Sequence, residues 1–398
     1  MKRVLGLILA VAMLVSLAAC QSAAPSPNSA ATSTKTSVAE TTAPASTVAP
    51  ATTTAPASTL NIPSNLPKKR ILVRQTNFTN VLYAGWKSSL ESLQDKFNVE
   101  FVFVETGSST DASVQALESA LQKGIDGSLD MEAPEQSLQL MKPTNCATAL
   151  YSSEPADAKM AASYPNYIGA INEDNYGSGV NAAEALYKAG CKKIAVAGLT
   201  KGVAKLMDDR LRGFLDGVAK HPDMKIIAED YSMVEFSKAI STFSAAYPEM
   251  DGLFVSLINE SVFQAIATEG LVGKVKLAGW DVSDSTLDYI NNGTLVYTGA
   301  GQEGSIQAAF AVLYNYLYDG TYLIPDRTKT VPRAFIEIKT ADDYNNYLKY
   351  VVNAKVYTPD EVASMIKAFN PSYTFEQFAA MNSNYSLQDI MQRHADQK

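Results

Sequence analysis

From about residue 68 to residue 280, short runs rich in β-branched and aromatic residues alternate with longer amphipathic runs. The short runs are typical of strands and the long ones of helices. The predicted strands are 70–74, 99–104, 128–131, 147–151, 167–171, 193–198, 225–229, 252–255 and 276–280. The predicted helices are 82–97, 111–123, 179–189, 206–220, 235–247 and 261–269, with Asp111 as the N-cap of the second.

This alternation falls into two successive blocks, which meet between residues 171 and 179. It predicts an α/β fold of two doubly wound lobes, each with a parallel sheet and right-handed crossovers. Ligands of such sheets bind beyond the carboxyl ends of the strands. Two facing lobes would therefore place a binding site in a cleft between them.

The segment after Pro332 has a pattern of its own. Residues 333–338 read as a returning strand. Thr358, followed by Pro359, has the pattern of an N-cap with proline at the first helical position, and Thr374 opens another helix in the same way. We expect this tail to pack on the second lobe.

The first 19 residues have the pattern of an export signal. Lys2 and Arg3 precede an uncharged, mostly apolar run over residues 4–19. That length is marginal for a membrane-spanning helix, which needs about 20 apolar residues, but it suits the apolar region of a secretory signal.

The run ends in Leu17-Ala18-Ala19-Cys20, which resembles the bacterial lipobox at all four positions. Small residues let the backbone lie extended in a peptidase cleft, and the thiol can accept a diacylglyceryl group. We predict a lipoprotein signal peptide over 1–19 and an acylated Cys20, which anchors the protein to the outer face of the cell membrane. The alternative is an ordinary signal peptide that ends in cysteine by chance.

Composition separates a tether from a folded part. Residues 20–67 are mostly Ser, Thr, Ala and Pro, and bury too little apolar surface to fold, so we predict a disordered tether. The remainder is long enough for two lobes with real cores, and 46% of the whole chain is apolar.

Charge and residue content exclude several function classes. The net charge of −8 argues against a nucleic-acid partner. With His221 and His394 as the only histidines, the sequence shows no metal motif and no Ser/His/Asp arrangement. We therefore expect no enzyme activity, no metal and no cofactor. Cys146 and Cys191 could pair, but buried free thiols are the preferred interpretation.

Four segments resemble the type I periplasmic binding proteins, the sugar-binding group that includes the ribose- and galactose-binding proteins. They are Asp174-Asn175-Tyr176-Gly177-Ser178-Gly179, Arg210-Leu211-Arg212-Gly213-Phe214, Gly279-Trp280-Asp281 and Gly301-Gln302-Glu303. The resemblance covers roughly residues 70–330. It implies an N-terminal lobe of 68–172 plus 302–331 and a C-terminal lobe of 173–301 plus 332–398. Three strands would join the lobes, which would close on ligand by hinge bending.

A sugar presents hydroxyls that donate and accept, and apolar faces, so its site needs charged or amide groups and aromatic rings. Arg210 offers a planar fork of donors and Asp281 offers acceptors. The resemblance and this chemistry together select a set of candidate ligand-binding residues: Asn77, Phe78, Asp174, Asn175, Arg210, Trp280, Asp281 and Gln302.

Each candidate also has a structural interpretation. Asp174 and Asp281 could cap helices, and Arg210 could form a surface salt bridge. Gln302 could be purely structural, and Trp280 could be either a stacking platform or a packing residue. Trp86, behind Phe78, is expected in the core.

The sequence also departs from the resembled group. An aspartate-arginine pair common after the fourth strand is absent from Leu150-Tyr151-Ser152-Ser153-Glu154. An asparagine-aspartate pair is replaced by Leu257-Ile258-Asn259-Glu260. These changes leave ribose- or galactose-like specificity open.

Together with the lipobox, the resemblance implies a monomeric substrate-binding lipoprotein that captures a small polar ligand, a sugar by preference, and delivers it to an ABC permease. A sensory receptor of the same fold and a nucleoside-binding lipoprotein are the alternatives.

The lipobox generates the first prediction. Cys20→Ala removes the acylation site, so the protein is expected in a soluble fraction, or uncleaved with its signal. Cell fractionation with immunoblotting checks this. Normally processed, membrane-associated protein from the variant would contradict acylation of Cys20.

Overall fold

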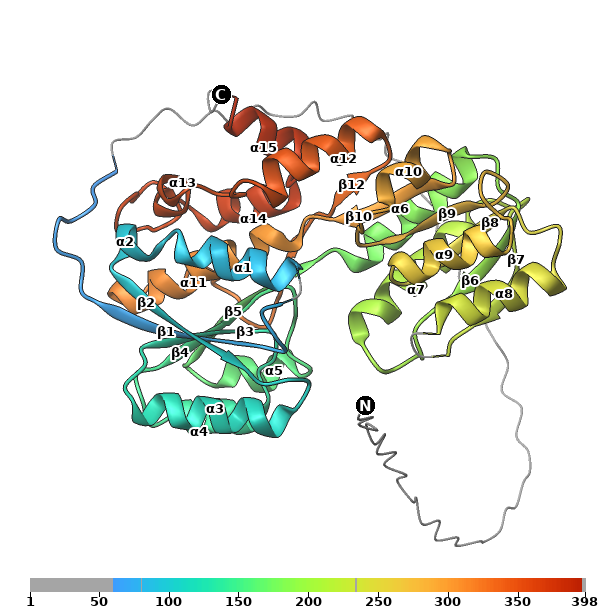
Figure 1. The fold of residues 1–398 in the computed structure, drawn as a ribbon. Coiled ribbons are helices and arrows are strands. Elements are labelled where there is room, and N and C mark those ends of the chain that lie inside the picture. Colours follow the sequence, from blue (N-terminus) through green and yellow to red (C-terminus); the bar gives the residue numbers. More distant parts are fainter. Residues whose placement is uncertain (1–59, 80, 233–234, 396–398) are drawn as a thin grey trace, which may run out of the picture. The chain divides into compact units, whose positions relative to one another are not determined.

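A computed structural model describes residues 60–79, 81–232 and 235–395 (Figure 1). The predicted signal peptide, Cys20 and the tether up to residue 59 lie outside these ranges. The described residues form two six-stranded sheets, with strand orders β11-β5-β4-β3-β1-β2 and β12-β10-β9-β8-β6-β7. All neighbouring strands run parallel except β10 and β12, which are antiparallel.

The first lobe is built around the first sheet. Its strands are β1 (Lys69–Gln75), β2 (Val99–Glu105), β3 (Gly127–Asp130), β4 (Ala147–Leu150), β5 (Tyr167–Glu173) and β11 (Val331–Arg333). Its helices are α1 (Val81–Glu91), α2 (Gln94–Phe97), α3 (Thr110–Gln122), α4 (Glu135–Met141), α5 (Ala158–Ser163) and α11 (Ser305–Asp319), which follows the short turn η1 (Gln302–Gly304). Figure 1 shows α1 and α11 on one face of this sheet and α3 and α4 on the other.

The second lobe repeats the arrangement. Its strands are β6 (Lys193–Ala197), β7 (Lys225–Asp230), β8 (Gly252–Val255), β9 (Lys276–Trp280), β10 (Leu295–Ala300) and β12 (Ile336–Ile338). Its helices are α6 (Asn175–Lys188), α7 (Lys205–Ala219), α8 (Phe236–Ala246), α9 (Glu260–Thr268) and α10 (Thr286–Asn291). The tail contains α12 (Ala341–Tyr347), η2 (Leu348–Val352), α13 (Pro359–Ser364), α14 (Phe375–Ser383) and α15 (Leu387–Arg393).

Central strands of both sheets are buried along their whole length, as expected where helices cover both faces of a parallel sheet. This is why the strands read as continuous apolar runs. The predicted helix over 82–97 is in fact two helices, α1 and α2. Asp111 is not an N-cap, because Ser109 takes that place and accepts from the Ala112 amide at 3.2 Å.

The chain passes between the sheets three times: after β5, after β10, and between β11 and β12. The predicted fold of two doubly wound lobes joined by a three-strand hinge is therefore confirmed. The strand predicted over 333–338 is wrong in one respect. It is two short strands in different sheets, because Ala334 and Phe335 form the third crossing.

Residues 60–67 belong to the folded part, so the prediction of a tether up to residue 67 is wrong at its end. Leu60, Ile62 and Leu66 pack against the core. The Asn61 amide donates to the Phe369 carbonyl at 3.0 Å. Averaged composition hid these three apolar side chains because polar and proline residues separate them.

The tail contacts both lobes, so the prediction that it packs on the second lobe is wrong for its later part. Helix α12 packs on α10 and β12, whereas α13 packs on α11 and α14 on β11. Asn315 of α11 donates to the Met365 carbonyl at 3.0 Å and accepts from the Lys367 amide at 2.8 Å. The cause is the buried α11, whose outer face these residues cover. Thr358 and Thr374 are the predicted N-caps, each in a capping box.

Helices α6 and α7 approach closely because glycines line their contact. A Cβ on Gly179 would lie 2.1 Å from the Arg210 carbonyl oxygen, and one on Gly213 would lie 2.0 Å from that of Tyr176. No side chain fits at these distances. The glycine in the segment 210–214 therefore fixes Arg210 against the start of α6.

This packing generates the second prediction. Gly213→Ala should lower the free energy of unfolding by about 1–3 kcal/mol or more, because backbone must move to admit the methyl group. Gly85→Ala is the matched control in α1: its Cβ would have its nearest neighbour at 3.9 Å. The control should be neutral or stabilising by up to about 1 kcal/mol. Denaturant unfolding measures both, and equal effects would contradict the close-packing argument.

Candidate ligand-binding site

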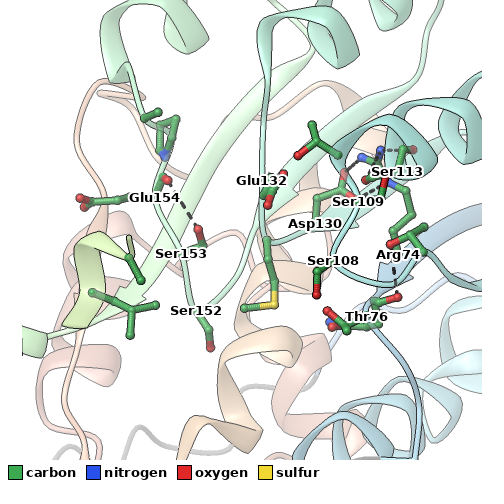
Figure 2. A pocket seen from close by; sticks show the side chains of 18 of the residues that line it. Arg74, Thr76, Ser108, Ser109, Ser113, Asp130, Glu132, Ser152, Ser153 and Glu154 are labelled. Carbon is green, nitrogen blue, oxygen red and sulfur yellow. Dashed lines mark hydrogen bonds and ion pairs between the residues drawn. The ribbon is translucent and has the colours of Figure 1, made fainter. Parts of the chain in front are cut away.

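A hollow of about 490 Å³ lies at the carboxyl edge of the first sheet (Figure 2). Its wall comes from the ends of β1, β3 and β4, the β2–α3 loop, and the start of α7 in the second lobe. Hydroxyl and carboxylate groups dominate the lining residues labelled in Figure 2, which include Thr76, Ser108, Ser109, Ser113, Asp130, Glu132, Ser152, Ser153 and Glu154. Such a lining suits a ligand rich in hydrogen-bonding groups.

The cations of this hollow are already neutralised by protein carboxylates. Arg74 is buried, and its Nε and Nη2 contact the two oxygens of Asp130 at 2.8 and 2.7 Å. Lys205, at the start of α7, contacts Glu154 at 2.9 Å. Glu132 adds a further carboxylate to the wall. The hollow therefore favours an uncharged ligand over an anion.

Arg210 of α7 is a buried cation whose orientation is fixed. Its Nε donates to the Asn175 side-chain oxygen at 2.8 Å, and its guanidinium carbon lies 5.0 Å from the Trp280 ring and 5.2 Å from the Phe335 ring. Burial lowers the pKa of Arg210, and the charge of Asp281 opposes that effect.

The guanidinium keeps unused donors. Its Nη1 has a single weak partner, the Met207 sulfur at 3.7 Å. Within the described ranges, no residue accepts a hydrogen bond from Nη2. The protein thus orients a planar donor group without saturating it.

Asp281 follows β9 with φ of 74°, a region that non-glycine residues seldom adopt and that is enriched at binding sites. Its amide donates to the Gly299 carbonyl at 3.0 Å, and its own carbonyl accepts from the Thr298 hydroxyl at 2.6 Å. No described residue donates to its carboxylate. Burial raises the pKa of Asp281, and Arg210 partly offsets this. The residue is not a helix cap, since Ser285 holds that place before α10.

Three of the other candidates have structural contacts. Asn175 orients Arg210 and donates to the Glu173 carbonyl at 2.9 Å. Trp280 is fully buried and donates to the Ser178 hydroxyl at 2.7 Å, so it is a packing residue that also supports the guanidinium. Asp174 caps α6 by accepting from the Gly177 amide at 2.8 Å.

The remaining candidates, Asn77, Phe78 and Gln302, contact other residues. Asn77 accepts from the Thr79 amide and hydroxyl, both at 3.1 Å. Phe78 packs edge-on against Phe103 at 5.4 Å. The Gln302 carbonyl accepts from the indole of Trp86 at 2.9 Å, and Trp86 is buried, as predicted.

The structure thus brings Asn175, Arg210, Trp280 and Asp281 together, but none of the eight candidates lines the hollow. Sequence reasoning missed Thr76, Glu132 and Ser152 of its wall. The available signal was their position within two residues of the end of a predicted strand. Tyr83 is near both the hollow and Asp281. It lines the hollow, and its pKa is raised by burial and by the charge of Asp281.

The described ranges contain no group of three or more His, Cys, Asp or Glu that could hold a metal ion. None of their helices has the length and apolar character to cross a membrane. Cys146 and Cys191 are buried and unpaired, as predicted, and burial raises the pKa of each thiol to about 12.

Solved structures share this fold. A solute-binding protein of an ABC transporter from Actinobacillus succinogenes, with bound D-allose, is 19% identical with a TM-score of 0.60, covering 70% of this chain and 99% of that one. One from Agrobacterium vitis, bound with α-D-tagatopyranose, is 19% identical with a TM-score of 0.58, covering 72% and 98%. The arabinose-transporter binding protein from Shewanella sp. ANA-3, bound to L-arabinofuranose, is 16% identical with a TM-score of 0.58, covering 71% and 95%.

No curated protein matches the sequence. The sequence model described as the periplasmic binding protein domain matches residues 72–321. This match covers both sheets apart from the first residues of β1 and the short strands β11 and β12. The chain therefore belongs to the periplasmic binding protein domain family.

Proposed function

We propose that this protein is an extracytoplasmic substrate-binding lipoprotein that captures an uncharged sugar between its lobes and delivers it to an ABC permease. The observation that carries this proposal is the pair Arg210 and Asp281. Arg210 is buried and oriented by Asn175, and the backbone of Asp281, which is partly exposed, is held by hydrogen bonds on both sides. Both side chains keep unused hydrogen-bonding capacity. Both also lie near the carboxyl edge of the second sheet, where ligands of α/β sheets bind.

The pair matches the chemistry of a sugar hydroxyl. A hydroxyl can accept from the Arg210 guanidinium and donate to the Asp281 carboxylate at the same time. Hydrogen bonds to charged groups contribute about 1.5–3 kcal/mol each. Three or four such bonds support binding in the micromolar range or tighter.

Two observations favour a neutral sugar over other ligands. Arg74 and Lys205 already have carboxylate partners, so the hollow has no unpaired cation among these two residues to bind a phosphate or carboxylate. Among the described residues of its wall, Tyr83 is the sole aromatic one, whereas a nucleoside base is usually held between rings. The three structural relatives described above were each bound to a sugar.

The lipoprotein part of the proposal rests on the segment Leu17-Ala18-Ala19-Cys20. Two acyl chains anchor a protein stably, whereas one does so weakly. Acylation at Cys20 would keep the binding domain at the membrane that contains the permease. A sensory receptor could use the same site, and loss of sugar uptake on deletion of the protein separates transport from sensing.

The third prediction tests the ligand class. A thermal-shift screen of the full chain should show a higher melting temperature with one or more neutral monosaccharides, because a ligand that binds the folded state stabilises it. D-allose, D-tagatose and L-arabinose head the panel, with nucleosides and sugar phosphates as comparisons. Stabilisation by nucleosides alone would contradict the proposed sugar.

The fourth prediction tests the site. Asp281→Asn removes the charge and keeps the shape, and Asn tolerates positive φ, so folding should be unaffected. The change should weaken binding by about tenfold or more, because a charged hydrogen bond becomes a neutral one. Calorimetric titration with the sugar found in the screen measures this.

Asp174→Asn is the matched control, because the Asp174 side chain caps α6, Asn caps equally well, and the backbone contact of this residue is unchanged. Its affinity should equal that of the unaltered protein. Equal affinities for Asp281→Asn and Asp174→Asn would rule out a ligand contact at Asp281.

A further inference from the structure

The segment 341–395 lies beyond the residues that the family model matches, which end at 321. Within the described ranges it contacts both lobes. Helix α12 packs on α10 and β12 of the second lobe, whereas α13 packs on α11 of the first (Figure 1). Helix α14 packs on β11 of the first lobe. The segment therefore spans the region where the chain crosses between the sheets.

The third crossing is anchored to this segment through Arg333, whose side chain is fully buried. Its Nη1 donates to the Asn382 side chain at 2.7 Å, and both Nη atoms lie 3.2 Å from the Tyr357 hydroxyl. The guanidinium carbon lies 3.6 Å from the Tyr385 ring centroid. Every hydrogen bond of the guanidinium within the described ranges thus goes to the segment. A buried charge that loses such partners is strongly destabilising.

The second crossing is anchored through Glu303, which follows β10 and is 9% exposed. Its Oε1 accepts from the Tyr347 hydroxyl at 2.5 Å, and its Oε2 is buried without a donor. Burial raises the pKa of Glu303. The hydrogen bond from Tyr347 lowers this pKa, and the nearby charge of Asp281 raises it further. Tyr347 therefore holds a carboxylate within electrostatic reach of the binding pair.

The first crossing is tied to the other two. The Asp174 amide donates to the Arg333 carbonyl at 2.7 Å. The Ser152 hydroxyl, which lines the hollow, donates to Glu173 at 3.1 Å and lies 2.6 Å from the Ser305 hydroxyl. The wall of the hollow, all three crossings and the segment are thus joined by hydrogen bonds.

We propose that residues 341–395 form a positioning element of the binding site, which fixes the hinge crossings through Glu303 and Arg333 and so sets the arrangement in which Arg210 and Asp281 meet the ligand. The inference rests on the proposed function for its effect on affinity. Apparent affinity falls in proportion to the fraction of molecules in the competent arrangement. Residues that never touch the ligand can therefore tune its binding.

Tyr347→Phe tests this proposal, with Tyr373→Phe as the matched control. Both remove one hydroxyl from a tyrosine of the same segment. The Tyr347 hydroxyl reaches the hinge, whereas that of Tyr373 contacts the Met381 sulfur within the segment at 4.0 Å. Hydrogen–deuterium exchange of the full chain without ligand compares peptides that contain the crossings at 173–175, 300–305 and 333–336 with the rest of the protein.

Tyr347→Phe should speed exchange of the crossing peptides about tenfold relative to Tyr373→Phe, as expected for loss of one hydrogen bond to a charged group. Titration with D-allose, D-tagatose and L-arabinose should show a matching loss of affinity in Tyr347→Phe alone. Unchanged exchange at the crossings would overturn the proposal, and so would faster exchange with unchanged affinity.

If none of the three sugars binds the unaltered protein, the proposed choice of ligand fails instead. The exchange result then still decides whether the segment holds the crossings, because it needs no ligand. Equal exchange in the two variants would overturn that link whatever the ligand is.

Discussion

The guanidinium of Arg210 is a cation held inside the protein, and the binding region is arranged around it. Two aromatic rings flank it, and Asn175 fixes its Nε. The glycine contacts between α6 and α7 set the position of the backbone that carries it. A buried charge is costly unless its donors find acceptors. The protein supplies one full hydrogen bond and leaves the outer donors available, which is the condition for recognising a polar ligand.

Acidic groups complete this arrangement near the hinge. Burial raises the pKa of Glu173, Asp281 and Glu303, and the two buried arginines, Arg210 and Arg333, act against that rise. The charges come from different crossings and different lobes, so rotation of one lobe changes the distances between them. Electrostatics and lobe geometry are therefore coupled in this region, and ligand binding and hinge position are expected to depend on each other.

The strand and helix order could be predicted because parallel strands covered on both faces must be apolar throughout, and this leaves a clear signal. The end of the tether could not be predicted, because Leu60, Ile62 and Leu66 are isolated in sequence. Only their contacts with the core show that they belong to the folded part. The placement of the tail depends on the buried α11, whose outer face no local pattern reveals.

Within the site, Arg210 and Asp281 could be selected from sequence because segments of characteristic spacing contain them. Asp174 was ambiguous, as the same position after a strand suits a helix cap and a ligand group, and the cap is what the structure shows. Sequence allowed Trp280 to be either a stacking platform for the ligand or a packing residue. Its full burial shows that it is a packing residue. The hydrogen-bond partners of Arg333 lie between 24 and 49 residues further along the chain, at separations where sequence patterns carry no contact information.

A crystal structure of the protein with a bound sugar would test the central claim most directly. The predicted result is a sugar between the lobes, with one or more hydroxyls within hydrogen-bond distance of the Arg210 Nη atoms and the Asp281 carboxylate. A sugar bound elsewhere, with both groups still unengaged, would contradict the claim that Arg210 and Asp281 recognise the ligand.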